Sequence, residues 1–199
     1  MKIAVIGAGH IGATLGRAWA AAGHEVRFGV QTPDRYDALA GMGAVLPVPA
    51  AAEGADAIVL AVPGAAVPAV LQQLAPAAST AIIVDATNNV GAGTLNAAAA
   101  IAEAAPGAAY YRAFNTLGWE NFAHPTFANG ERVDLFYAGA DGPARAAMER
   151  LIADVGLRPV WVGGPEHVET VDGVTRLWFA LVMGRRLPRR TAFRVLSEG

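Results

Sequence analysis

The sequence contains no cysteine, and this absence excludes disulfide bonds, thiol nucleophiles and thiolate metal sites. Lys2 is the only lysine and stands at the start of the chain, so neither a Tyr-x-x-x-Lys reductase motif nor Schiff-base chemistry is available. The only serines are Ser79, expected in a loop, and Ser197 near the end. A serine nucleophile with a His/Asp partner is therefore not expected.

Charge is scarce as well, with 16% charged residues and a net charge of −2. This composition favours neither nucleic acid nor an anionic membrane as a partner. The longest apolar stretch, residues 57–71, contains two prolines and falls short of the roughly 20 residues that span a membrane. The chain begins on a predicted strand rather than a basic-then-apolar leader, so we expect a soluble, cytoplasmic protein.

The histidines show no metal-binding pattern. His10, His24, His124 and His167 are scattered, without an i,i+4 pair and without a carboxylate at ligand spacing. No metal site is predicted.

Hydrophobic residues make up 54% of the sequence and fall into short runs separated by helical stretches. Eight runs are typical of strands: residues 2–7, 25–29, 44–48, 56–62, 80–86, 108–114, 133–139 and 157–163. Helical spacing marks residues 11–22, 66–74 and 143–155, and the alanine clusters at 97–100 and 102–105 also favour helix. This alternation predicts an α/β fold, a Rossmann-type, doubly wound and mostly parallel sheet.

The pattern changes after Gly164. Residues 1–164 are interpreted as the dinucleotide-binding domain and residues 165–199 as a helical C-terminal segment. A helix starting near Pro165 would carry one apolar face, and Pro188 would separate it from a short final helix at residues 189–196. Because so short a piece cannot bury a core alone, we expect it to pack on the main domain or on a second subunit, giving a homodimer.

A glycine-rich turn follows the first predicted strand and opens a helix. It consists of Gly7, Ala8, Gly9, His10, Ile11 and Gly12. Such a turn needs its first glycine for the tight bend, its second for the approach of a pyrophosphate and its third for close helix–strand packing. Amides at the positive end of the helix would hold the phosphates. The six residues therefore predict a dinucleotide site, the alternative being a glycine-rich turn that binds nothing.

The end of the second predicted strand bears on the choice between NAD and NADP. An acidic residue there would bind the ribose hydroxyls of NAD and repel a 2′-phosphate. This chain has Gln31, Thr32 and Arg35 instead, which we assign to the cofactor site, with Thr32 and Arg35 as possible phosphate ligands. The pattern favours NADP and leaves NAD possible, since Arg35 can equally be a solvated helix-start residue.

Further motifs stand at the ends of later strands: Ala61-Val62-Pro63, residues 85–88 (Asp-Ala-Thr-Asn) and residues 112–116 (Arg-Ala-Phe-Asn-Thr). Arg-Leu-Trp at 176–178 and Ala-Phe-Arg at 192–194 lie near the end. With these motifs and residues 3–12, the chain resembles the NADP oxidoreductases that depend on the deazaflavin coenzyme F420, and the related dinucleotide domain of membrane ferric reductases. It departs from them after the second strand, where Gly29-Val30-Gln31 replaces the usual Gly-Ser-Arg, and at Asn89, where proline is usual.

The resemblance implies where the cofactor and its reaction partner bind. The loops after three strands would line the nicotinamide half of the cofactor, through Ala61, Val62, Pro63, Asn88, Asn115 and Thr116. Leu117 and Trp119 would contact the acceptor. The implied activity is hydride transfer between NADPH and a deazaflavin or flavin, which needs alignment of two rings rather than a dedicated acid. No catalytic residue is assigned.

Two alternatives remain open. The first is an enzyme that reduces a small imine or carbonyl compound, with Tyr110, Tyr111 or Asp85 as the acid. The second is a cofactor-sensing module without turnover. Acceptor-dependent oxidation of NADPH distinguishes among the three.

Overall fold

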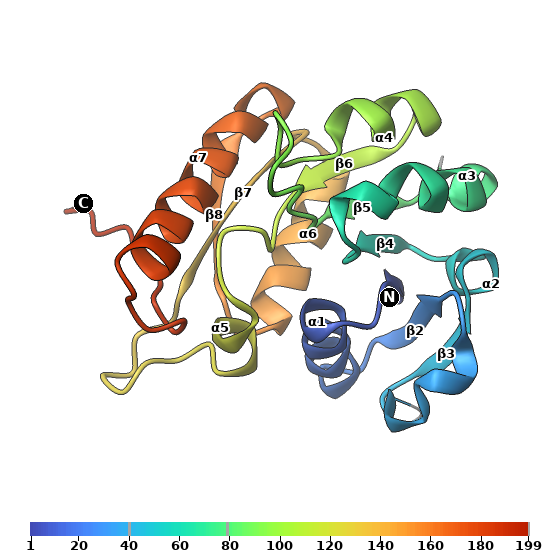
Figure 1. The fold of residues 1–199 in the computed structure, drawn as a ribbon, viewed down its shortest axis with the longest axis horizontal. Coiled ribbons are helices and arrows are strands. Elements are labelled where there is room, and N and C mark those ends of the chain that lie inside the picture. The colour runs from blue at the N-terminus through green and yellow to red at the C-terminus, as the bar shows by residue number, and fades with distance from the viewer. Residues whose placement is uncertain (40, 79, 199) are drawn as a thin grey trace.

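The fold is an eight-stranded sheet with helices on both faces, seen in a computed structural model that describes residues 1–39, 41–78 and 80–198 (Figure 1). The strands run in the order β3-β2-β1-β4-β5-β6-β7-β8. Their bounds are β1 Lys2–Ile6, β2 Glu25–Val30, β3 Ala44–Pro47, β4 Ala57–Leu60, β5 Ile82–Asp85, β6 Ala109–Arg112, β7 Asp134–Gly139 and β8 Arg158–Gly163. This confirms the predicted Rossmann-type sheet.

All neighbouring strands pair in parallel except β6 and β7, which are antiparallel. The central strands are apolar on both faces because helices cover both, and every residue of β4 is buried. Parallel β1, β4, β5 and β6 therefore end at one edge of the sheet, where the chain order reverses between β1 and β4. Open α/β sheets bind ligands at this edge.

The helices form two layers. Longer helices are α1 His10–Ala21, α3 Val67–Ala78, α4 Ala98–Ala104, α6 Pro143–Asp154 and α7 Val168–Phe179, and α2 Val48–Ala52 and α5 Trp119–Ala123 are short. One core cluster joins α1, α5 and α6 to the sheet around Trp19, Phe114 and Phe122. The other joins α2, α3 and α4 to the opposite face around Ile6, Leu60 and Leu74. The alanine-rich residues do form a helix, α4.

The C-terminal segment differs from the prediction in one element. Helix α7 continues as one π-turn, Ala180–Gly184, but the predicted final helix at residues 189–196 is wrong. Backbone carbonyls of these residues accept hydrogen bonds from other parts of the chain. The Thr191 carbonyl accepts from the Trp178 indole at 2.8 Å, and the Phe193 carbonyl accepts from the Asp134 amide at 3.3 Å. An extended segment satisfies these long-range bonds, which a helix would have to break. The segment thus packs on the same chain.

The structure bears only in part on two further expectations from the sequence. Ser79 lies outside the described residues. Within the described part of the chain, no helix is long and apolar enough to cross a membrane.

Candidate functional site

The glycine-rich turn has a different steric reason for each of its glycines. Gly7 has φ +99°, and a Cβ there would lie 2.5 Å from the carbonyl oxygen of Ala61. A Cβ at Gly12 would overlap the carbonyl oxygen of Gly7, so helix α1 can pack this closely only without a side chain. At Gly9 a Cβ would meet nothing within 4 Å. The turn is therefore tight at both ends and open at Gly9, as a phosphate site requires.

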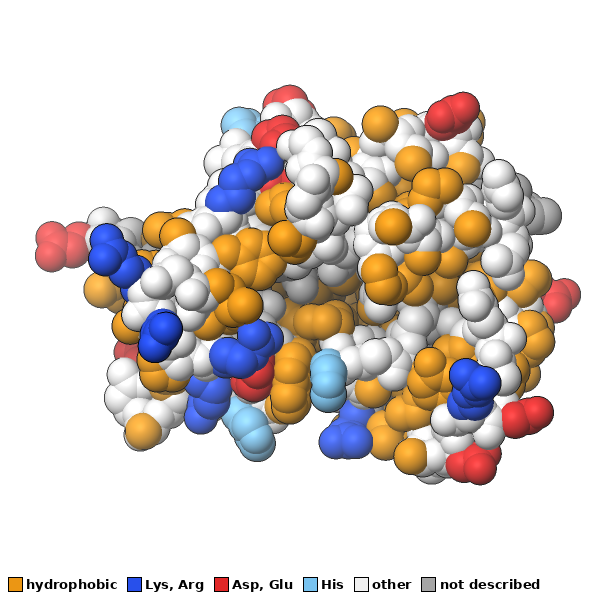
Figure 2. All heavy atoms as spheres, in the orientation of Figure 1, with side chains coloured by type: hydrophobic (Ala, Val, Ile, Leu, Met, Phe, Trp, Pro, Cys, Tyr) orange, Lys and Arg blue, Asp and Glu red, His pale blue; other side chains and the backbone are white. Residues whose placement is uncertain are grey.

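A cavity of about 590 Å³ lies beside this turn, at the carboxyl ends of β1, β4, β5 and β6. Figure 2 shows the molecule hollowed between α7 and α1, with hydrophobic side chains inside. The lining residues are Gly9, His10, Ile11, Ala61, Val62, Pro63, Ala86, Asn88, Asn115, Leu117, Gly118, Trp119, Trp178, Phe179, Met183 and Arg189. The cavity thus joins residues from the whole length of the chain.

Most of the site residues expected from the sequence lie together in this cavity. The exceptions are Gly7, Ala8, Gly12 and Thr116, in or behind its wall, and Gln31, Thr32 and Arg35, exposed at the end of β2. An extended dinucleotide would have to run from the cavity over Gly9 to reach β2. Among described residues, no hydrogen bond or ion pair engages the Arg35 side chain.

Sequence reasoning missed the wall that the C-terminal segment supplies. Trp178, Phe179, Met183 and Arg189 line the cavity opposite the strand ends. The apolar periodicity of the helix did mark Trp178, but as core. Nothing local indicated that this helix would lie across the strand ends, because that placement depends on contacts more than 50 residues apart.

Aromatic rings give the cavity flat walls. His10 and Trp119 are stacked, with ring centroids 5.1 Å apart and planes 14° apart. On the other side, the Arg189 guanidinium lies 5.6 Å from the centre of the Trp178 ring and forms an ion pair with Glu120. Flat apolar walls with charge confined to the rim suit a planar ring.

The approach to Asn115 contains a strained residue. Phe114 has φ +60°, one of two non-glycine residues in the described ranges with positive φ. Its ring is held edge-on by Trp19 and Phe122, at centroid distances of 5.7 and 5.8 Å. Such left-handed backbone persists where the surroundings over-determine it. The buried ring therefore fixes the bend that brings Asn115 to the cavity.

A buried ionic network supports the cavity floor. The side chains of Arg112, Asp85 and Asp172 are 0% exposed. Arg112 donates through Nε to Asp172 Oδ1 at 2.8 Å, and its Nη1 lies 3.2 Å from Asp85 Oδ1. It also donates to the Thr87 carbonyl at 2.5 Å and to Asn88 Oδ1 at 3.1 Å. One arginine thus joins β5, β6 and α7 beneath the cavity.

Asn115 connects this network to the cavity. Its Nδ2 donates to Asp172 Oδ1 at 3.2 Å and to Thr175 Oγ1 at 2.8 Å, both on α7. Its backbone carbonyl accepts from Asn88 Nδ2 at 3.2 Å. Asn115 is 2% exposed, and its Oδ1 has no hydrogen-bond partner among the described residues. The buried hydroxyl of Thr116 is likewise without one.

The acids considered for imine or carbonyl reduction lie outside the cavity. Asp85 is bound to Arg112, and the Tyr110 hydroxyl donates to Asp85 at 3.1 Å. Burial and the neighbouring Asp85 raise the pKa of Tyr110 above its ordinary value, which weakens it further as an acid. Tyr111 donates to the Ala140 carbonyl at 2.8 Å, and burial raises its pKa too. None of these three side chains lines the cavity that holds the cofactor-site residues.

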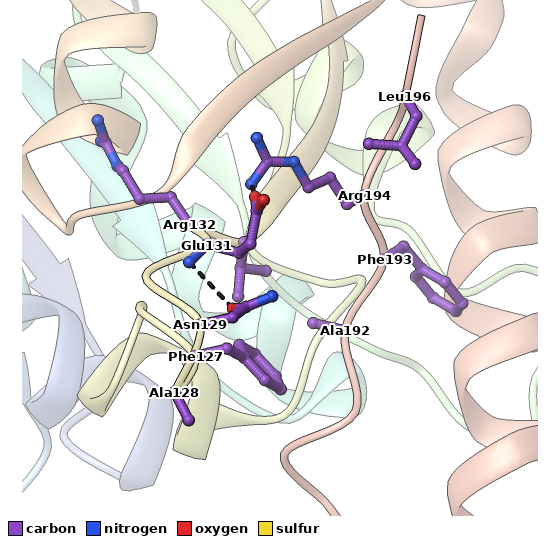
Figure 3. Close-up of a pocket in the computed structure, with 10 residues that line it drawn as sticks. Phe127, Ala128, Asn129, Glu131, Arg132, Ala192, Phe193, Arg194 and Leu196 are labelled. Carbon is purple, nitrogen blue, oxygen red and sulfur yellow. Dashed lines mark hydrogen bonds and ion pairs between the residues drawn. The ribbon is translucent and has the colours of Figure 1, made fainter.

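A second cavity, of about 520 Å³, lies between residues 127–133 and the C-terminal segment (Figure 3). Figure 3 shows Phe127 and Phe193 on opposite sides, and Arg194 paired with Glu131. No residue assigned to the cofactor or acceptor lines it. In the described part of the chain no cluster of potential metal ligands occurs either.

Comparison with known families and structures agrees with this site. Residues 2–89 match the family model described as NADP oxidoreductase coenzyme F420-dependent. That range includes the glycine-rich turn and Asn88. The comparison with curated proteins gives no match.

Solved structures extend the likeness in fold to the rest of the chain. A putative F420-dependent NADP reductase from Arthrobacter sp. FB24 is 23% identical, with a TM-score of 0.85, covering 99% of this chain and 100% of that one. A hypothetical protein from Sinorhizobium meliloti is 26% identical over 82% of this chain and 85% of its own, with a TM-score of 0.69. A reductive aminase from Aspergillus terreus in complex with NADPH is 20% identical, with a TM-score of 0.69. It aligns over 92% of this chain, which spans 62% of the aminase.

Proposed function

We propose that this chain, whose residues 2–89 match the family model of the coenzyme F420-dependent NADP oxidoreductases, transfers a hydride between NADPH and a deazaflavin or flavin acceptor. NAD(P)-dependent oxidoreduction is the activity of the family; the acceptor and the preference for NADP are the proposal. Bound cofactor would supply the hydride, and the chain would supply alignment of two rings.

The chemistry of the lining is the observation that carries the proposal. Among the described residues of the 590 Å³ cavity, only His10 and Arg189 have ionisable side chains, and the rest are apolar, aromatic or amide groups. Carbonyl reduction needs a proton at the new alkoxide, whereas a deazaflavin or flavin exchanges its proton with solvent after accepting hydride. A flat cavity poor in acids therefore favours a ring acceptor.

The residues present fit the cofactor. Gly9 leaves open space at the start of α1, whose first N–H groups have no side-chain cap and suit a pyrophosphate. Asn115 would meet the nicotinamide end. Gln31, Thr32 and Arg35 would meet the adenosine end, where the absence of an acid at the strand end favours NADP.

The test is transfer from NADPH carrying deuterium at one or the other face of C4. We expect acceptor reduction with label from one face only, using a deazaflavin and FMN as probes. Replacing Tyr110 or Tyr111 by Phe should change the rate far less than the 10²–10⁴-fold typical of losing a general acid. Efficient reduction of imines or ketones with no reduction of either ring acceptor contradicts the proposal.

A small imine or carbonyl substrate is the second candidate, and His10 is the observation that favours it. His10 lines the cavity and stacks on Trp119, so its imidazole would supply the proton under this alternative. Under this alternative His10→Gln would remove at least a hundredfold of the imine reduction rate. Under ring-to-ring transfer the same change would leave the rate within tenfold.

A further inference from the structure

We propose that Oδ1 of Asn115 accepts a hydrogen bond from the nicotinamide carboxamide, and that Asp172 and Thr175 of α7 are the positioning residues that turn this oxygen toward the cofactor. This deepens the proposed function and rests on it for the identity of the ligand. Asn115 itself lines the cavity, whereas Asp172 and Thr175 do not.

The orientation of the Asn115 amide is fixed by its partners. A carboxylate can only accept hydrogen bonds, so the group facing Asp172 Oδ1 at 3.2 Å must be the NH₂ end. The same Nδ2 donates to Thr175 Oγ1 at 2.8 Å, while the Thr175 hydroxyl donates to the Asn115 carbonyl at 3.3 Å. Turning the amide over would place Oδ1 against a carboxylate. Both N–H groups are thus used on α7, and Oδ1 is the atom of this amide that lacks a partner among the described residues.

Oδ1 is left with a missing partner. It is buried in a residue that is 2% exposed and accepts nothing from the described chain. Burying an acceptor without a donor is unfavourable, and such atoms in native proteins require an explanation. Because Asn115 is among the residues that line the cavity, a donor on the ligand would supply the missing partner.

The carboxamide of nicotinamide supplies such a donor. Its NH₂ group is the only neutral N–H donor on that ring, and it projects from the carbon next to the hydride-bearing position. A hydrogen bond from the carboxamide to Asn115 would fix how the nicotinamide ring is rotated and how deeply it lies in the cavity. Asp172 is itself held by Arg112 and by Asn96 Nδ2 at 2.8 Å, so the oxygen is presented from a rigid base.

The experiment compares NADP⁺ with its 3-acetylpyridine analogue, in which a methyl group replaces the NH₂. Binding is measured by calorimetry, so turnover is not needed. The wild-type chain should favour NADP⁺ over the analogue by about three- to tenfold, the range for one neutral hydrogen bond. Asn115→Leu should bring this ratio close to one.

Two substitutions of Thr175 form a second, more conservative pair of variants. Thr175→Val removes the acceptor for Nδ2 and should lower the ratio, whereas Thr175→Ser keeps the hydroxyl and should retain it. 2′-Phosphoadenosine diphosphoribose, which lacks the nicotinamide, should bind all variants alike. This pair keeps the test valid if Asn115→Leu does not fold.

Two results overturn the inference at different levels. A ratio that is equal in wild type and in the Asn115 and Thr175→Val variants, with the ring-free fragment still bound, rejects the Asn115 contact alone. Failure of the wild type to bind either NADP⁺ or the fragment rejects the proposed function as well.

Discussion

At the scale of single residues, the glycines of one turn differ in whether the protein itself leaves room for a side chain. Gly7 and Gly12 are required by the protein itself, because a side chain at either would collide with backbone. Gly9 has φ −73° and open space around its Cβ position, so the protein alone tolerates a side chain there. A pyrophosphate at the proposed site would need this open space.

Gly9→Val is expected to fold normally and to bind NADP⁺ at least tenfold more weakly, which corresponds to about 1.4 kcal/mol. The valine would occupy the space of the pyrophosphate without touching the protein. Thermal unfolding measures the first effect and calorimetric titration the second. Gly93→Val, another open position but outside the cavity, is the control and should leave affinity unchanged. Unaltered affinity in folded Gly9→Val would place the site elsewhere.

Arg35→Ala tests the choice of cofactor. If the Arg35 side chain meets the 2′-phosphate, its loss should weaken NADP⁺ by about 1.5–3 kcal/mol and leave NAD⁺ nearly unaffected. Arg176→Ala, on the exposed side of α7, serves as the matched control. Equal losses for both cofactors, or none for either, would identify Arg35 as a solvated residue.

At the scale of elements, buried carboxylates fix the C-terminal segment to the sheet. Asp172 attaches α7 to β6 through Arg112. Asp134, fully buried on β7, accepts from Arg158 at 2.5 and 2.7 Å and from the Val195 amide at 2.7 Å. The C-terminal segment therefore has a defined place on the sheet without forming a second helix.

Arg158→Ala should lower the free energy of unfolding by about 1.5–3 kcal/mol, because it leaves the Asp134 carboxylate buried without its charged partner. Denaturant titration measures the change. Arg150→Ala breaks an exposed pair with Asp154 and should cost no more than about 0.5 kcal/mol. Similar values for the two variants would show that the pair of Arg158 with the buried Asp134 has no special role.

At the scale of the whole molecule, the chain's own C-terminal part forms one wall of the site. The chain spans 62% of the Aspergillus terreus reductive aminase but all of the Arthrobacter protein. Its cavity is walled by its own α7 and the segment that follows. Apolar side chains remain exposed there: Leu177 is 50% and Leu187 42% exposed. We propose both leucines as part of the interface of the homodimer expected from the sequence.

The homodimer is tested by sedimentation of the wild-type chain and of a Leu177→Glu/Leu187→Glu variant. We expect a dimer for the wild type and a monomer for the variant, because charge at an apolar interface is costly to bury. Val90→Glu, at a 69% exposed position in another loop, should stay dimeric. A monomeric wild-type chain would contradict the prediction.

Local sequence determined the sheet and the glycine-rich turn. Each strand is an apolar run that must be covered on both faces, and the turn between Gly7 and Gly12 has steric requirements that only glycine meets. Both depend on residues close together in the chain. For that reason the strands and the glycine-rich turn were predicted from local pattern, whereas the order of the strands was not.

Tertiary structure decided what faces that edge. The pairing of Asp172 with Arg112 and the orientation of Asn115 join residues 60 and 57 positions apart, and the wall formed by Trp178 faces residues as distant in the chain as Gly9. From the sequence, Tyr110 and Asp85 were considered as possible acids. In the folded chain, Tyr110 donates to Asp85, which pairs with Arg112 in the buried network. The direction of a side chain at a strand end depends on which helix covers it, and that is fixed by long-range burial rather than by neighbouring residues.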